Sequence, residues 1–232
     1  SGRGADGAVA GAGLTNPGAI QYGDGARDLA DLLRLVPGFQ SSTSFAGDMQ
    51  HGTYHGGASE FAARALVRVD GRVVYSAYLL GSSGLGLQTL ALEDIERVEV
   101  LRGSNSAAYG ARAFLGVVNI VSRDTKDTQG LALGVAGGQN GVRDLSLRWG
   151  HVISGLGLRI SADQRGDDGL VGSNGPARVR RLNAQTQVRL NHHDELELRA
   201  GTVQVLATRG FVGRAGNPVR ERTDSAQHFQ VD

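Results

Sequence analysis

The second half of the chain alternates apolar and polar residues with a period of two. In residues 181–190 every second side chain is apolar or threonine, and the positions between them carry arginine, asparagine or glutamine. The same alternation recurs at 145–150, 156–163 and 195–200. Because successive side chains of a strand point to opposite faces, each segment predicts a β-strand with one apolar and one polar face.

About six such strands are expected, near 130–137, 143–152, 156–164, 179–190, 195–206 and 225–232. Short connections at 154–155 and 191–194 alternate with long polar ones at 164–178 and 208–222. A soluble sandwich and a transmembrane barrel both produce amphipathic strands, with bulk water on the polar face of the first and a wet lumen on that of the second. Tight turns alternating with longer loops favour the barrel.

The first half mixes helix and strand signals. Residues 26–36 place four apolar side chains on one helical face, and Pro37 ends the helix. Residues 64–75 predict a hairpin around Asp70-Gly71, a favoured two-residue turn. The polar and glycine-rich stretches between these elements are expected to be loops.

The stretch Ile95–Arg123 joins these two regions. Residues 97–100 alternate charged residues with valine, which is typical of a half-buried strand. Residues 117–121 form a denser apolar run, as expected of a strand covered on both faces. Three glycines, which permit a positive φ or a close backbone approach, separate the two strands: Gly103, Gly110 and Gly116.

This stretch resembles the end of the plug domain of TonB-dependent outer-membrane receptors, where the family pattern is IE-R-IEV-RGP-S-YG-A-GGVINI-T. The matching residues are Ile95, Glu96, Val98, Glu99, Val100, Arg102, Gly103, Ser106, Tyr109, Gly110, Ala113, Gly116, Val117, Asn119, Ile120 and Ser122. Ser104 stands where the family has proline, and Leu115 where it has a first glycine. Two further matches occur in order: DLLRLVPGF at 31–39 and RALVRVDG at 64–71.

The resemblance implies an α+β plug domain, a small mixed sheet with short helices, followed by antiparallel strands of an incomplete transmembrane β-barrel. The expected organisation is a flexible tail at 1–25, the plug at 26–125 and the first barrel strands at 126–232. A receptor barrel of this family has about 22 strands around a plugged lumen. The chain is therefore expected to be a fragment of a longer protein.

The implied function is active transport across the bacterial outer membrane, with the plug gating the lumen, and not enzymic catalysis. The cargo would be a scarce nutrient such as an iron–siderophore chelate or a vitamin B12-like ligand, carried as substrate, with no cofactor. The implied partners are TonB with its inner-membrane energising complex, the metal chelate and outer-membrane lipid, and the full-length receptor is expected to be a monomer. Nothing in residues 1–25 matches the family's TonB-interacting segment.

Four residues are candidates for substrate contact, because the family's plug loops at these places rise to the outer face: Tyr54, His55, Tyr75 and Tyr78. For any single one, a loop or packing role is the alternative interpretation. His51 and His55 have the i, i+4 spacing of a helical metal site, but Gly52 and Gly56 disfavour a helix there. No metal site is therefore predicted.

A second set of residues is expected to be structural. The resemblance implies that the charges Glu96, Glu99 and Arg102 pair with the barrel wall and hold the plug in place. The remaining members of the set belong to the same motif: Gly103, Tyr109, Gly110, Gly116 and Asn119.

Composition narrows the function classes. Glycine supplies 36 of 232 residues, against a usual share of about 7%, which favours a turn-rich β protein. The chain has no cysteine, and a net charge of +1 without a basic aromatic patch gives no reason to expect nucleic acid. No apolar run of about 18 residues and no signal peptide is present, so an exported chain is expected to be mature or trimmed. A secreted all-β adhesion or structural module is the alternative.

The expected plug boundary can be tested directly. Residues 24–125, produced alone, should give a soluble, folded fragment, because that segment contains the whole expected plug. Circular dichroism and gel filtration measure the outcome. A fragment that does not fold would contradict the boundary.

Overall fold

The computed structural model describes residues 14–15, 26–33, 35–43, 50–54, 65–75, 84–104, 106–110, 112–169, 175–191, 194–209, 215–216 and 219–232. Two of the candidate substrate residues, His55 and Tyr78, lie outside these ranges, as does most of the expected tail. Within that tail, Leu14–Thr15 form strand β1, where the sequence predicts no strand.

The described elements before residue 129 are β1, α2 (Leu29–Leu33), β2 (Phe39–Thr43), β3 (Gln50–Tyr54), β4 (Ala65–Val69), β5 (Arg72–Val74), η2 (Gly84–Gln88), η3 (Leu92–Asp94), β6 (Ile95–Arg102), α3 (Ser106–Tyr109), β7 (Gly116–Ser122) and η4 (Thr125–Thr128). The elements that follow are β8 (Gly130–Gly137), β9 (Arg143–Ile153), β10 (Leu156–Asp167), β11 (Ala177–Arg189), β12 (Glu195–Arg209) and β13 (Arg220–Val231).

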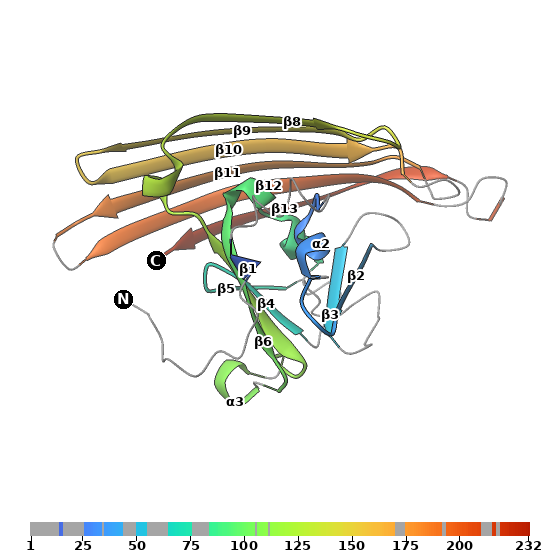
Figure 1. Ribbon diagram of the computed structural model, residues 1–232, viewed down its shortest axis with the longest axis horizontal. Helices are drawn as coiled ribbons and strands as arrows, with labels where there is room; N and C mark the ends of the chain where they lie inside the picture. Colours follow the sequence, from blue (N-terminus) through green and yellow to red (C-terminus); the bar gives the residue numbers. More distant parts are fainter. Residues whose placement is uncertain are drawn as a thin grey trace.

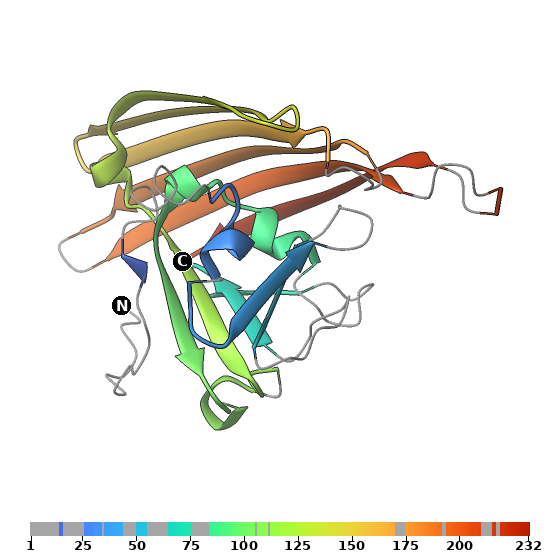
Figure 2. The ribbon, with the colours of Figure 1, turned by 45° about the vertical axis from the view of Figure 1, so that its right-hand side comes forward.

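The elements from β1 to β7 form what we call the five-stranded unit, residues 14–122 as far as they are described. Its sheet has the order β1-β6-β7-β4-β5, in which only β4 and β7 run parallel. Helix α2 and the β2–β3 hairpin lie on one side of this sheet (Figures 1 and 2). Leu32 and Leu33 of α2 belong to one buried cluster with Val98, Val100 and Ile120 of the sheet.

The predicted hairpin at Asp70-Gly71 is present. Asp70 has φ +47° and Gly71 φ +80°, the left-handed backbone that a tight two-residue turn requires. Its strands pair from Val67 with Val74 to Val69 with Arg72. No helix among the described residues is long and apolar enough to cross a membrane.

The described residues from 130 to 231 form a six-stranded antiparallel sheet in the order β13-β12-β11-β10-β9-β8. This confirms the predicted strands, although β10 and β12 end later, and β13 begins earlier, than predicted. The sheet is open, with β8 and β13 at its edges, and it curves across one side of the five-stranded unit (Figure 1). Ser154 and Gly155, both at positive φ, turn β9 tightly into β10.

This sheet buries its polar face and exposes its apolar face. On β10 the side chains of Arg159, Ser161, Asp163 and Arg165 face the five-stranded unit and are at most 8% exposed. Ile160, between two of them, is 41% exposed on the other face. The same inversion holds on β11. Since soluble sheets bury their apolar face, the outer face fits apolar surroundings.

The core of the five-stranded unit predicts a contrast between two neighbouring leucines. Leu32→Ala should lower the free energy of unfolding by about 2 to 5 kcal/mol, because it leaves a cavity in the buried cluster. Leu35→Ala removes the same atoms from a side chain that is 46% exposed, so its cost should stay within about 0.5 kcal/mol. Chemical unfolding followed by circular dichroism measures both, and equal costs would contradict the assigned core.

Candidate functional site

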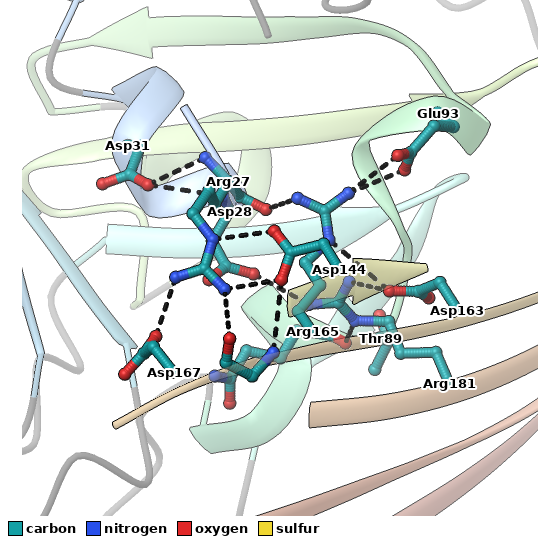
Figure 3. A network of polar contacts seen from close by, with 12 residues as sticks. Arg27, Asp28, Asp31, Thr89, Glu93, Asp144, Asp163, Arg165, Asp167 and Arg181 are labelled. Atoms are coloured by element: carbon teal, nitrogen blue, oxygen red, sulfur yellow. Dashed lines mark hydrogen bonds and ion pairs between the residues drawn. The ribbon is translucent and has the colours of Figure 1, made fainter. Parts of the chain in front are cut away.

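The two sheets meet in a network of ion pairs (Figure 3). Arg27, just before α2, donates from Nε and Nη2 to the two carboxylate oxygens of Asp144 on β9, at 2.8 and 2.6 Å. Its Nη1 donates to Asp167 at the end of β10, at 2.7 Å. These bonds, above all the one to Asp144, raise the pKa of the Arg27 guanidinium against the opposing effect of burial. Asp31 accepts the Arg27 backbone N–H at 3.1 Å, which ties the arginine to the helix.

Two arginines of the six-stranded sheet reach in the opposite direction. Arg165 on β10 donates from Nη2 to both carboxylate oxygens of Glu93, at 2.8 and 3.0 Å, and from Nη1 to the Arg27 carbonyl oxygen. Arg181 on β11 donates to Asp28 and Asp163, both at 2.8 Å, and to the Gln88 carbonyl oxygen at 2.6 Å. Each sheet therefore supplies both cations and anions to the same network.

Further inward side chains of the six-stranded sheet also bond to the five-stranded unit. Asn183 donates to the Thr89 carbonyl oxygen at 3.1 Å, and Ser161 donates to Asp94. Further along the sheet Arg199 lies 3.3 Å from the Asp70 carboxylate. These contacts can hold the two sheets together or, when broken, release them. Among the described residues no group of three or more acids, histidines or cysteines is placed to bind a metal.

Burial makes these pairs energetically coupled. The side chains of Arg165, Arg181 and Asp163 are at most 5% exposed. A buried charge costs several kcal/mol unless it is paired and hydrogen-bonded, and removing one partner leaves that cost uncompensated. The network therefore makes the stability of the six-stranded sheet depend on the charges that the five-stranded unit supplies, and the reverse.

Glu96 and Glu99 make their observed contacts inside the five-stranded unit. Both accept from Arg97 at 2.8 Å, and Glu99 also accepts from the Asn119 side-chain amide on β7 at 2.8 Å. Burial opposes ionisation of Glu99, but the hydrogen bonds from Asn119 and Arg97 outweigh it and lower the pKa of the carboxyl group. Pairing of these acids with a barrel wall stays a prediction.

The other motif residues surround the β6–β7 connection. Gly103 and Gly110 have φ near +90°, and a Cβ at Gly116 would lie 2.6 Å from the Leu101 carbonyl oxygen, so all three need glycine. Arg102 is exposed at the end of β6. The Arg68 guanidinium lies 5.9 Å from the centre of the Tyr109 ring.

The two described candidates for substrate contact belong to different elements. Tyr54 ends β3 and pairs with Phe39, whereas Tyr75 follows β5 and is 55% exposed. The Arg112 guanidinium lies 4.2 Å from the centre of the Tyr75 ring, a cation–π contact. The structure thus links Tyr75 to a residue that the sequence did not single out.

Sequence reasoning missed the residues of the ion-pair network. Arg181 occupies a polar position of a predicted amphipathic strand, so its side of the sheet was foreseeable, whereas Arg165 falls in the connection predicted after residue 164 and belongs to β10 in the structure. Their partners Asp28 and Glu93 lie 153 and 72 residues away in the sequence. No local pattern connects positions that far apart, and the one available signal was the charge on the inward face.

Comparison with known proteins gives a family match for part of the chain. Residues 19–117 match the family described as the TonB-dependent receptor plug domain. The vitamin B12 transporter BtuB of Photobacterium profundum is 31% identical over 151 residues, which cover 62% of this chain and 23% of that protein. The iron-regulated outer membrane virulence protein of Vibrio cholerae is 30% identical over 191 residues, covering 75% and 28%. This chain thus spans about a quarter of the length of these relatives.

Solved structures share the fold. The ferric yersiniabactin uptake receptor FyuA from Yersinia pestis superposes with a TM-score of 0.74 at 18% identity, over 95% of this chain and 38% of that chain. The FrpB iron transporter from Neisseria meningitidis gives 0.68 at 16% identity, over 89% and 35%. The likeness confirms the expected fold class, a small mixed sheet followed by antiparallel barrel strands.

The network predicts a large coupling between Asp28 and Arg181. Arg181→Ala should lower the free energy of unfolding by about 3 to 5 kcal/mol, because it leaves the buried Asp163 carboxylate without its closest cation. Arg97→Ala, which breaks a pair on a partly exposed strand, should cost less than about 1 kcal/mol.

A double-mutant cycle on Asp28 and Arg181 measures the coupling energy between the five-stranded unit and the six-stranded sheet. Each variant is unfolded with denaturant in detergent. Strictly additive effects of Asp28→Ala and Arg181→Ala would show that the two sheets are not held by this pair.

Proposed function

Because this chain belongs to the TonB-dependent receptors of the outer membrane, with their plug domain followed by six strands of their barrel, we propose that it serves in a transporter for an iron–siderophore chelate. The five-stranded unit is the plug. This family consists of transporters and not enzymes. Because the chain belongs to it, we set aside the alternative of a secreted adhesion module. Relatives named for iron regulation and ferric chelate uptake support the iron class, and the relatives named for vitamin B12 keep a cobalamin as the second candidate.

The observation that carries the proposal is the inverted sheet. A wall that is apolar outside and charged inside, with a plug ion-paired to its charged face, is what a gated pore through a bilayer requires. The plug blocks the lumen, and transport requires the plug to break part of its contacts with the six-stranded wall. Many moderate polar contacts suit such an element better than a continuous apolar interface, since water can replace them as they open.

TonB, with its inner-membrane energising complex, is the proposed source of energy. Ligand binding on one side and TonB binding on the other would bias the plug between two arrangements, and only a difference in affinity for the two states can shift that equilibrium.

Tyr54, His55, Tyr75 and Tyr78 are proposed to contact the ligand. The Tyr75–Arg112 pair supports this for Tyr75, because an exposed aromatic ring beside a guanidinium suits an anionic, aromatic chelate. The same pair gives Arg112 a place in the proposed contact surface.

The proposal is tested in a receptor that contains this chain. Energised uptake and binding should be measured for ferric enterobactin, ferric yersiniabactin and cyanocobalamin. One ferric chelate should bind, and Tyr75→Ala combined with Tyr78→Ala should weaken its affinity by about tenfold, the scale of one or two lost aromatic contacts. Tyr109→Ala, an exposed aromatic outside the proposed surface, is the control.

Uptake of cyanocobalamin alone would move the assignment to the second candidate. Unchanged chelate affinity in the double tyrosine variant would remove Tyr75 and Tyr78 from the contact surface. Binding that survives loss of TonB while uptake stops would match the proposed energy source.

A further inference from the structure

Three arginines lie on the outer, apolar face of the six-stranded sheet: Arg143 on β9, and Arg178 and Arg180 on β11. Their face follows from the strand pairing, because residues directly opposite each other on neighbouring strands share a face. Arg180 pairs with Gln164 of β10, which in turn pairs with the exposed Leu145 of β9. All three arginines are exposed. They therefore meet the same surroundings as the apolar side chains of the wall.

The three side chains gather around one glycine of β10. Gly166 pairs with Arg143 on one side and with Arg178 on the other, so no side chain stands between these two arginines. A Cβ at Gly166 would lie 3.9 Å from Cγ of Arg178, which places the stem of this arginine beside the glycine. Arg180 donates from Nε to the side-chain oxygen of Gln164 at 2.9 Å, so its side chain also leans over β10. Because neighbouring strands lie about 4.8 Å apart, the guanidinium groups can reach one small anion together.

The described part of the chain does not balance the charge of this cluster. None of its three arginines forms an ion pair with a described carboxylate. Asp168, one residue beyond the end of β10, lies against Gly141 and is not paired with them. The inward arginines differ, since Arg165 meets Glu93 and Arg181 meets Asp28, each at 2.8 Å. The wall thus pairs its inward cations within the chain and leaves the outward ones available to an external anion.

The cluster lies at one end of the apolar outer face. Leu145, Leu147 and Trp149 follow Arg143 along the outward side of β9, and all three are exposed. At the cluster's end of the sheet, β10 and β11 are joined by the longer connection 168–176, whereas the tight turn between β9 and β10 lies at the opposite end. A lipid whose acyl chains cover this apolar face can therefore place its headgroup at the arginines.

We propose that Arg143, Arg178 and Arg180 bind the phosphate group of an anionic lipid, whose acyl chains lie along the adjoining apolar face of β9–β11. Arginine suits this role because its planar guanidinium group can donate two parallel N–H bonds to phosphate oxygens. The apolar surface that continues from the cluster favours a lipid over a free phosphate ion. The site lies on the side of the wall away from the plug (Figure 1). It goes beyond the transport proposed above and does not depend on the cargo.

Competition between two lipids tests the site. A receptor containing this chain is mixed in uncharged detergent with equal amounts of phosphatidylglycerol and phosphatidylcholine, and native mass spectrometry measures the lipid retained. Both headgroups carry phosphate, but the choline group cancels its charge. The unchanged receptor should prefer phosphatidylglycerol, and the triple variant Arg143→Gln, Arg178→Gln and Arg180→Gln should lower that preference at least about fivefold. An unchanged preference in the triple variant would overturn the site.

A matched pair of single variants separates the cluster from a general effect of charge. Arg178→Gln should lower the preference at least about twofold, because it removes one of the three cations. Arg189→Gln removes the same charge from an exposed arginine at the other end of β11, in register with the inward side chains, and should leave the preference unchanged. Equal effects of the two substitutions would contradict a local site. Circular dichroism checks that both variants fold like the unchanged receptor.

Trp149 reports on the lipid close to the cluster. It lies on the outer face of β9, about 20 Å along the strand from Arg143, where the acyl chains of a lipid held at the cluster would run. Its fluorescence is obtained as the difference between a receptor with Trp149 and its Trp149→Phe variant. Phosphatidylglycerol with brominated acyl chains should quench it at least about twofold more than brominated phosphatidylcholine at the same fraction of the vesicle. The triple variant should remove that difference, and equal quenching by both lipids in the unchanged receptor would overturn the proposal.

Inorganic phosphate distinguishes the two sources of the anion. Potassium phosphate in excess over lipid, added at constant ionic strength, should leave phosphatidylglycerol bound, because the free ion makes no contact with the apolar face. Displacement of the lipid would overturn it as the occupant in favour of the free ion. None of these measurements requires a transported ligand, so failure of the proposed transport and failure of the lipid site are read separately.

Discussion

The need to pair buried charges is the constraint on which the rest of the structure depends. The inner face of β10 and β11 carries arginines and an aspartate that are almost wholly removed from water. Such groups are tolerated only when opposite charges and carbonyl oxygens meet them. The plug supplies these partners from the start of α2 and from η2 and η3, so the wall and the plug specify each other's position.

The same constraint explains how a plug can be held firmly and still move. Its contacts to the wall are directional and polar, and water can replace them one at a time. Their distribution is uneven: Arg165 and Arg181 anchor the plug on β10 and β11, while the small side chains of β8 leave a gap. The polar contacts therefore hold the plug chiefly along β9, β10 and β11.

Much of the fold could be predicted from local sequence. Period-two alternation located β9, β10, β11 and the first half of β12, because an apolar outer face and a polar inner face leave the same pattern in each of these segments. Asp70-Gly71 located a hairpin for a similar local reason. The pairing of the charges could not be predicted, since Arg27 meets Asp144 across 117 residues. Glu96 and Glu99 illustrate the difference: their observed partners are Arg97 beside them and Asn119 on the neighbouring strand, which the barrel-pairing expectation did not include.

The central claim is that the six-stranded sheet turns its apolar face to lipid and its charged face to the plug. Trp149, the single tryptophan of the chain, lies on the outer face of β9 and is 42% exposed. Its fluorescence in vesicles, taken as the difference between the unchanged protein and Trp149→Phe, reports its surroundings. Quenching by brominated acyl chains and protection from aqueous iodide is the predicted result. Quenching by iodide with no effect of brominated lipid would contradict the account.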